Sequence, residues 1–434
     1  MTERKNGVAL GAVAAIALMV MGSLAGPATA AEGERAHGAA LELREALGGL
    51  ESAEVDRDGD GHVDYTRACR ITAHRLVDAD NDSNPEFLYI AAVCREAADR
   101  NGNGTMDTWR VTTGNFTRVD RDDDGNPERT ALHVASHLTA DRNEDNATDL
   151  TRAVQFAALA ADRDSDGRLD LVVAERSERF AVDTDFDGSN DVWGGERAQG
   201  RAADLAGRPA LDTFYANRAG AIFSDTDGDG APNAARSWQV SAFARDRDGD
   251  GIVEVKRVEA SRASWVDHDG DGSPEHAERA HFAAAAADRD DDGTFDLFTA
   301  RASSTAMSDA DSDGNPELRV FAAWNAYAVD RDDDGHIDHA AVCGVRATAV
   351  DRNSDGVVDA RERVSFCREW TAVRDGSDGG HDGAEADRAP EEVSHLIREL
   401  DAPERVLGEM PSVHGPLVGD LGDLPLADGT RHEL

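Results

Sequence analysis

Residues 162–182 read DRDSDGRLD and then LVVAERSERFAV, an acidic segment of nine residues followed by twelve residues with more apolar side chains. The acidic segment follows the pattern D-x-D-x-D-G-x-x-[DEN], which recurs along the chain with a first step of 22 residues and later steps of 21. Self-similarity at one fixed period predicts a repeat array, in which each unit contacts mainly its neighbours. The fifteen copies begin at Asp56, Asp78, Asp99, Asp120, Asp141, Asp162, Asp183, Asp204, Asp225, Asp246, Asp267, Asp288, Asp309, Asp330 and Asp351.

The motif has the donor set of a site for a hard cation. Positions 1, 3, 5 and 9 offer carboxylate or amide oxygens, and position 7 can add its backbone carbonyl, a combination that calcium prefers. Position 6 must turn sharply around the ion, and Gly occupies it in twelve of the fifteen copies. Ser83 and Asn146 take that place in two other copies, and Asn tolerates the left-handed backbone.

One copy lacks the pattern. The segment from Asp204 carries Ala206 and Arg208 at two ligand positions and Pro209 at the glycine position. The remaining fourteen copies are intact, so the sequence predicts up to about fourteen bound Ca²⁺ ions, one for each loop.

The predicted metal ligands fall into four columns, one for each ligand position of the motif. Position 1 is Asp56, Asp78, Asp99, Asp120, Asp141, Asp162, Asp183, Asp225, Asp246, Asp267, Asp288, Asp309, Asp330 and Asp351. Position 3 is Asp58, Asp80, Asn101, Asp122, Asn143, Asp164, Asp185, Asp227, Asp248, Asp269, Asp290, Asp311, Asp332 and Asn353. Position 5 is Asp60, Asp82, Asn103, Asp124, Asp145, Asp166, Asp187, Asp229, Asp250, Asp271, Asp292, Asp313, Asp334 and Asp355. Position 9 is Asp64, Glu86, Asp107, Glu128, Asp149, Asp170, Asp191, Asn233, Glu254, Glu275, Asp296, Glu317, Asp338 and Asp359.

The charge of the chain excludes some partners. Lys plus Arg number 45 and Asp plus Glu number 87, for a net charge of −42. Nucleic acid and anionic membrane surfaces need positive charge, so neither is an expected partner. High acidity alone is typical of disordered or highly soluble segments, but in this chain the acids recur at fixed positions. Because several acidic ligands crowd into nine residues, we expect folding to depend on the ion.

The ends of the chain suggest five regions. Residues 1–30 resemble a signal peptide, with Arg4 and Lys5 before an apolar run and a small-residue cleavage site at 28–30. Residues 31–55 are an expected N-terminal cap with a short helix, and 56–371 the array. Residues 372–389 read as an acidic Gly/Asp linker, and 390–434 as a short helix and a disordered tail. This plan predicts a secreted, extracellular or cell-surface protein with no membrane span after signal removal.

The segments between loops are predicted to form strands, which makes the fold class an all-β repeat array of stacked 21-residue units. Each unit would be a calcium loop plus short strands or a hairpin, and residues 108–119 (TWRVTTGNFTRV) suggest a turn at Gly114-Asn115. The alternative is an α-rich solenoid like EF-hands or dockerins. Residues 276–287 (HAERAHFAAAAA) have helical composition and favour it. A standard EF-hand needs a bidentate Glu at position 12 of its loop. Position 12 of the motif in this chain carries residues such as Arg67 and Tyr89, which opposes an EF-hand.

The four cysteines occupy matching columns at the two ends of the array. Cys69 and Cys343 each lie five residues after a loop, and Cys94 and Cys367 each lie eight residues after the next loop. This register favours Cys69–Cys94 and Cys343–Cys367 among the three connectivities that four cysteines allow. Because bonded cysteines need Cα atoms within about 7 Å, the pairing favours stacked coils or hairpins over a flat meander.

The loops resemble those of several extracellular calcium-binding families. The run from Asp162 to Asp170, with Leu171-Val172-Val173 after it, is similar to the FG-GAP repeats of integrin-type propellers. The acidic runs also resemble thrombospondin type 3 repeats and, less closely, dockerins. The resemblance covers the loop alone: FG-GAP blades are longer, and the thrombospondin cysteine pattern is missing. It implies calcium ligation at each loop and transfers neither a fold nor a partner.

Two classes of function are compatible with the sequence. The first is a secreted calcium-binding repeat protein with a structural, spacer or adhesive role, whose further partner would be a protein or a surface glycan. The second is an extracellular enzyme or a ligand-binding module on a calcium-stabilised scaffold. We expect no enzyme, because fourteen equivalent loops favour ligation and no G-x-S-x-G or H-E-x-x-H motif is present. Glycines beside the altered copy, such as Gly194 and Gly195, would let the array bend and expose a ligand-binding face.

Overall fold

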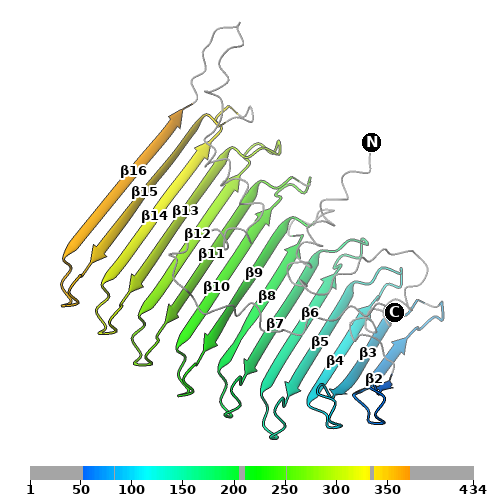
Figure 1. Cartoon of the computed structure of the whole chain (residues 1–434). Helices are drawn as coiled ribbons and strands as arrows, with labels where there is room; N and C mark the ends of the chain where they lie inside the picture. The colour runs from blue at the N-terminus through cyan, green and yellow to red at the C-terminus, as the bar shows by residue number, and fades with distance from the viewer. Residues whose placement is uncertain (1–51, 83, 205–210, 251, 333–336, 372–434) are drawn as a thin grey trace.

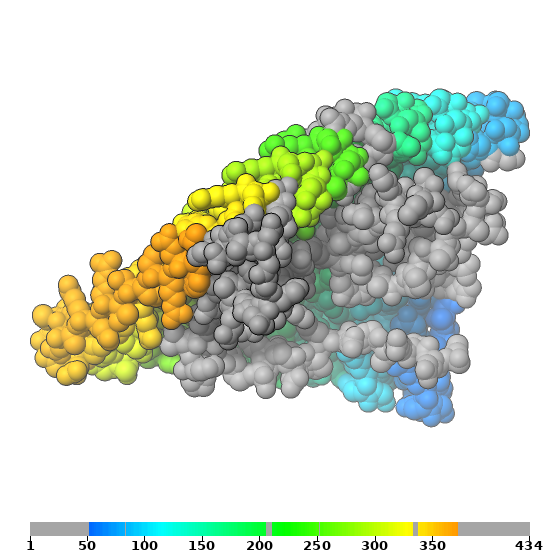
Figure 2. All heavy atoms as spheres, turned by 90° about the horizontal axis from the view of Figure 1, so that it is seen from above, coloured from blue at the N-terminus to red at the C-terminus, as the bar shows by residue number. Residues whose placement is uncertain are grey.

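The strands of this chain follow one another across a single sheet in the order in which they occur in the sequence. The computed structural model describes residues 52–82, 84–204, 211–250, 252–332 and 337–371. Within these residues sixteen strands form one antiparallel sheet in the order β1 to β16, and no helix is present (Figure 1). Seen from above, the colours run in sequence order from orange at one end of the molecule to blue at the other (Figure 2). The all-β prediction is confirmed.

Each inter-loop segment is one long strand. The strands are β1 (Ala53–Val55), β2 (Tyr65–Val77), β3 (Phe87–Ala98), β4 (Thr108–Val119), β5 (Arg129–Ala140), β6 (Leu150–Ala161), β7 (Leu171–Val182), β8 (Val192–Ala203), β9 (Thr213–Ser224), β10 (Ala234–Arg245), β11 (Val255–Val266), β12 (His276–Ala287), β13 (Leu297–Ser308), β14 (Leu318–Val329), β15 (His339–Val350) and β16 (Ala360–Thr371). From β3 onward every strand has 12 residues, so the nine-residue motif is the whole connection between two strands.

Two local expectations were wrong. The hairpin turn expected at Gly114-Asn115 does not form, because both residues pair within β4, Gly114 with Ala92 on one side and Val134 on the other. The nine-residue loops already reverse the chain, so a second reversal inside each unit is not needed. The helical alternative also fails at residues 276–287, which form β12 and pair along their full length with β11 and β13.

The first repeat is longer because it contains a bulge. The ladder between β2 and β3 shifts register between Ile71 and Ala73, where one extra residue enters β2. A bulge adds one residue to a strand without changing the pairing on either side of it. The 22-residue first step is therefore a feature of β2, whereas the first loop keeps its nine-residue length.

The buried apolar residues lie in clusters along the sheet. The largest cluster spans β11 to β15 and includes Val258, Phe282, Ala284 and Phe298, each at most 5% exposed. Directly opposed residues such as Val258 and Ala284 share one face, because side chains alternate between faces along a strand. Alanine fills many of these positions, which limits the apolar area that each strand can bury.

Both predicted disulfides are confirmed. Cys69 is the direct ladder partner of Cys94, with Cα atoms 4.1 Å apart. Cys343 is the direct partner of Cys367, at 4.0 Å. The objection to a flat meander was wrong, because it assumed two strands in each unit. Because each unit contributes one strand, the residue five places after one loop faces the residue eight places after the next loop.

Reduction of the disulfides should loosen only the ends of the sheet. In the chain-entropy model, a bond closing a loop of this size stabilises by on the order of 3 kcal/mol, and in a nearest-neighbour array the gain stays local. Hydrogen exchange after reduction should therefore quicken in β2, β3, β15 and β16 while β8 and β9 keep their protection. Simultaneous loss of protection in the central strands would contradict this expectation.

Candidate metal centres

The loops lie in two series, one along each edge of the sheet. Because successive strands are antiparallel, consecutive loops alternate between the edges, and loops on one edge are 42 or 43 residues apart. Each loop is joined to the preceding loop on its edge by a backbone hydrogen bond. The N–H of Asp120 donates to the carbonyl of Glu86 at 2.9 Å, and the N–H of Asp309 to that of Glu275 at 2.7 Å. Position 1 of one loop thus contacts position 9 of the preceding loop on that edge.

Within a loop the acidic side chains are oriented by backbone N–H groups. In the copy from Asp162, both carboxylate oxygens of that residue accept bonds, from Ser165 at 2.8 Å and Gly167 at 2.8 Å. Asp164 accepts from the N–H of position 5 at 3.3 Å, and Asp166 from position 7 at 2.9 Å. These bonds orient the first three acidic positions around the inside of the loop, where each oxygen retains further lone pairs.

Two positions of the loop have a left-handed backbone. Position 6 has a positive φ as expected, 82° at Gly167 and 69° at Asn146. Position 4 also has a positive φ, a feature that the sequence motif did not reveal. Non-glycine residues occupy it in eight described copies, among them Asp123 at 60° and Phe186 at 65°. Such a backbone costs a non-glycine residue roughly 1–2 kcal/mol, so the loop must stabilise it elsewhere.

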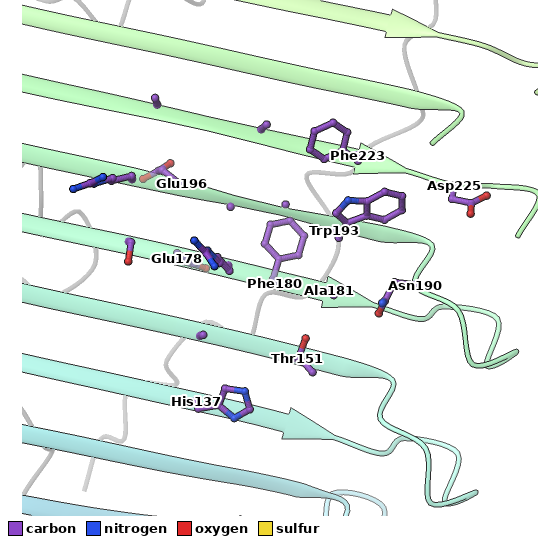
Figure 3. A pocket seen from close by; sticks show the side chains of 18 of the residues that line it. His137, Thr151, Glu178, Phe180, Ala181, Asn190, Trp193, Glu196, Phe223 and Asp225 are labelled. Atoms are coloured by element: carbon purple, nitrogen blue, oxygen red, sulfur yellow. The ribbon is translucent and has the colours of Figure 1, made fainter. Parts of the chain in front are cut away.

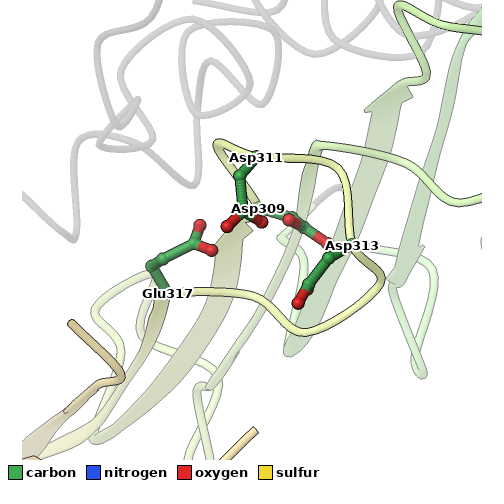
Figure 4. Close-up of side chains that lie close together, drawn as sticks. All are labelled: Asp309, Asp311, Asp313 and Glu317. Carbon is green, nitrogen blue, oxygen red and sulfur yellow. The ribbon is translucent and has the colours of Figure 1, made fainter. Parts of the chain in front are cut away.

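The copy from Asp309 brings its four acidic residues together. Asp309, Asp311, Asp313 and Glu317 each place a carboxylate oxygen within 4.8 Å of the others, and they gather inside one loop (Figure 4). Similar groups form from Asp56, Asp58 and Asp60, from Asp78, Asp80 and Asp82, and from Asp120, Asp122 and Glu128. Ten further groups of this kind are present in the described part of the chain.

Among the described residues, the buried acidic residues of the loops all lie at position 1 or position 9. Most first-position aspartates are below 9% exposed, and so are Asp64, Asp107, Asp149, Asn233, Glu254 and Asp296 at position 9. Positions 3 and 5 are mostly exposed, as at Asp58 and Asp60. The structure thus places two of the motif's acidic positions at the base of the loop and two nearer to solvent.

Several buried carboxylate oxygens have no hydrogen-bond partner. They are Oδ1 of Asp120, Asp149, Asp291, Asp309 and Asp351. The other oxygen of Asp120 is paired, because Oδ2 contacts Arg118 at 3.1 Å. A buried carboxylate without a partner is costly, so these oxygens need a compensating group.

The crowding of acidic residues raises the pKa of some carboxyl groups in the loops. Partial burial, followed by contact with Asp248 and the charges of Asp250 and Glu254, raises the pKa of Asp291 to about 6. Partial burial and the charges of Asp80, Asp82 and Glu86 raise the pKa of Asp123. Both residues occupy position 4 and face the acids of a different loop.

The altered copy keeps the backbone hydrogen bonds found at both ends of an intact loop. The N–H of Asp204 donates to the carbonyl of Asp170 at 2.8 Å, and the N–H of Asp212 to that of Ala203 at 3.0 Å. Asp212 is 2% exposed, close to the 1% of Asp149 at position 9 of an intact copy. Residues 205–210 lie outside the described part of the chain, as do the expected signal peptide, both expected terminal helices, Ser83, Asp334 and the acidic linker.

The glycine-rich segment before this copy does not bend. Gly194 and Gly195 lie within the continuous strand β8, and a Cβ on Gly195 would approach the carbonyl oxygen of Glu178 to 2.4 Å. A shallow hollow of about 860 Å³ lies over β7 to β9, with Trp193 stacked on Phe223 at 5.8 Å between ring centres (Figure 3). Glu178, which also lines this hollow, is held by Arg152 at 2.8 Å and Arg176 at 2.9 Å.

Comparison with known proteins gives no family. Neither a family model nor a curated protein sequence matches the chain. Among solved structures, the chain is similar to Wzi, an outer membrane protein involved in group 1 capsule assembly in Escherichia coli and a carbohydrate-binding β-barrel. The TM-score is 0.19 and the identity 8%, and the match covers 76% of this chain and 87% of the Wzi chain. BamA from Haemophilus ducreyi lacking POTRA domains 1–3 has a TM-score of 0.17 and 8% identity, with coverages of 77% and 79%. A bacterial polysaccharide outer membrane secretin has a TM-score of 0.15 and 9% identity, with coverages of 72% and 99%.

The predicted location is corrected by this comparison. The sequence predicted a secreted, extracellular or cell-surface protein, whereas Wzi and the secretin are outer membrane proteins, and that prediction is not retained. TM-scores of 0.15–0.19 carry no argument about what this chain binds or does. In the residues that the structure describes, no helix is both long and apolar enough to cross a membrane.

Proposed function

We propose that this chain is a calcium-binding repeat protein whose ions are part of the folded sheet. Fourteen intact loops would each hold one Ca²⁺, with ligands from positions 1, 3, 5 and 9. The observation that carries the proposal is the buried and unpartnered Oδ1 of Asp309 within a group of four converging carboxylates. A divalent cation is the group that would compensate such an oxygen, since calcium takes six to eight oxygen ligands.

The biological role that fits this proposal is structural. Fourteen divalent ions would lower the magnitude of the net charge from −42 to about −14, and would tie successive strands at both edges of the sheet. A long sheet stiffened in this way would serve as a spacer or an adhesive support. The proposal assigns no catalysis, because near-equivalent loops fit ligation whereas catalysis needs one asymmetric site.

Counting bound ions tests the proposal. Protein equilibrated with calcium and freed of excess ion should retain about fourteen Ca²⁺ per chain by elemental analysis, with much weaker retention of Mg²⁺. Magnesium demands a regular octahedral shell and gives up its water reluctantly, so a flexible loop of carboxylates discriminates against it. Retention of fewer than two or three Ca²⁺ per chain would refute the assignment of the loops as calcium sites.

A further inference from the structure

The residue at position 4 of a loop lies against the preceding loop on the same edge. Asp123, from the copy that begins at Asp120, has a carboxylate oxygen within 4.8 Å of oxygens of Asp80 and Glu86. The last two residues belong to the copy that begins at Asp78, and the two copies are joined by the backbone hydrogen bond from Asp120 to Glu86. One group of three acids is therefore shared between two loops.

The same contact recurs farther along this edge. Asp291 lies at position 4 of its loop, beside Asp248 of the preceding loop, whose charge helps to raise the pKa of Asp291. Its Oδ1 is buried and has no hydrogen-bond partner. Both loops supply carboxylates at this point, and a buried carboxylate oxygen without a partner is costly unless a cation or a proton compensates its charge.

The other edge shows the same arrangement with other side chains. The Oγ of Ser312 donates to Glu275 at 3.1 Å, and the Oγ of Ser354 donates to Glu317 at 2.9 Å. Glu317 belongs to the group of four acids that contains the unpartnered Oδ1 of Asp309. In each pair a position-4 side chain contacts the position-9 ligand of the preceding loop.

Glu144 supplies charge where the preceding loop has little of its own. The copy that begins at Asp99 carries Asn101 and Asn103 at positions 3 and 5, so only two of its four ligand positions are acidic. Glu144 at position 4 of the next loop on that edge accepts hydrogen bonds from both amides. A third carboxylate thus reaches this site from outside its own loop.

We propose that a calcium site is completed by the position-4 residue of the next loop on the same edge wherever that residue has a carboxylate or hydroxyl side chain, so that these neighbouring sites bind ions cooperatively. The inference rests on the proposed function. Asp123, Glu144 and Asp291 would add a carboxylate to the site of the preceding loop, whereas Ser312 and Ser354 would orient its position-9 ligand. Four side chains and one carbonyl from a single loop fall short of the six to eight ligands that calcium takes, and the adjacent loop fills part of that shortfall.

Two consequences follow for binding. An ion in one loop would order the position-4 residue of that loop and so raise the affinity of the preceding site, which is coupling between neighbouring sites. The two edges have no loop in common, so they would act as separate cooperative series. On one edge, the altered copy at Asp204 divides the series into two sets of loops. One set runs from the loop at Asp78 to the loop at Asp162, and the other runs from Asp246 to Asp330.

The variant Asp123→Asn tests the sharing of one site. Asn tolerates the left-handed backbone at least as well as Asp, so the substitution keeps the loop conformation. Hydrogen exchange of peptides covering residues 78–86 is followed at graded calcium concentrations in the full chain. The calcium concentration at half-protection should rise about 10- to 100-fold in the variant, the loss typical of a supporting ligand contact. The substituted residue lies outside the reporting peptide.

The controls separate this inference from the proposed function. Glu362→Gln removes the same charge from the exposed face of β16 and should leave residues 78–86 unchanged. Peptides covering 99–107, on the opposite edge, should not shift in Asp123→Asn. A wild-type chain whose loops show no calcium-dependent protection would overturn the proposed function and with it the inference. Calcium-dependent protection that Asp123→Asn leaves unchanged at 78–86 would overturn the inference alone.

Discussion

Removal of calcium should unfold most of the sheet. A site that is formed only in the folded chain stabilises it by about 2.7 kcal/mol when free ion is a hundredfold above the dissociation constant. Summed over the loops, this exceeds the roughly 5–15 kcal/mol that stabilises a typical domain. The acids that remain without the ion repel one another, and aromatic residues make up only 5% of the chain. Chelation should therefore abolish the far-ultraviolet signal of the strands and expand the hydrodynamic radius.

Two controls make this result specific to coordination. Sodium chloride at 0.15 M screens charges beyond about 8 Å, so it reduces general repulsion without supplying ligand geometry. If sodium chloride restored the sheet as fully as calcium, screening rather than ligation would be the cause. Magnesium should restore the fold only partly, because its octahedral shell suits these loops poorly. A spectrum and radius unchanged after chelation would contradict the expectation outright.

The regular architecture was predictable because the motif sets both the turn and the period. Nine residues with acids at alternate positions and a glycine turn are unlike a strand, so the twelve residues between copies are bounded on both sides. The positions of the cysteines relative to the loops also predicted which units pair, because Cys69 and Cys94 can only meet if adjacent units lie side by side. These inferences depend on local spacing, which the sequence displays directly.

Other features depend on neighbours that local spacing does not reveal. Composition suggested a helix at residues 276–287, yet small alanines also pack well between two full-length strands, and the ladder decides the outcome. Gly114 looked like a turn residue because nothing local shows that the loops already reverse the chain. The role of position 4 was missed because Asp123 contacts residues about forty positions earlier. A column of Gly, Ser, Asp, Glu and Asn at that position was the available signal, and Phe186 alone interrupts it among the described copies.

Repair of the altered copy should create a fifteenth site. Its ends already have the geometry of an intact loop, because Asp212 is buried and its carbonyl accepts the N–H of Asp246 at 2.8 Å. The combined change Ala206→Asp, Arg208→Asp and Pro209→Gly supplies the two missing ligands and the turn. The variant should bind one additional Ca²⁺ by elemental analysis and gain about 4 kcal/mol of stability when free ion is a thousandfold above the dissociation constant.

The gain should depend on the first ligand and on calcium together. Adding Asp204→Ala to the repaired variant removes position 1 while leaving the new carboxylates, and should abolish both the extra ion and the stabilisation. In the absence of calcium the repaired variant should be less stable than the wild type, because two new charges then lie unneutralised beside Asp212. A repaired chain that is more stable without calcium, or that retains no additional ion, would show that the loop residues do not act as ligands. Opposite signs of the effect with and without calcium distinguish coordination from improved turn geometry, since replacing Pro209 alone would act equally in both conditions.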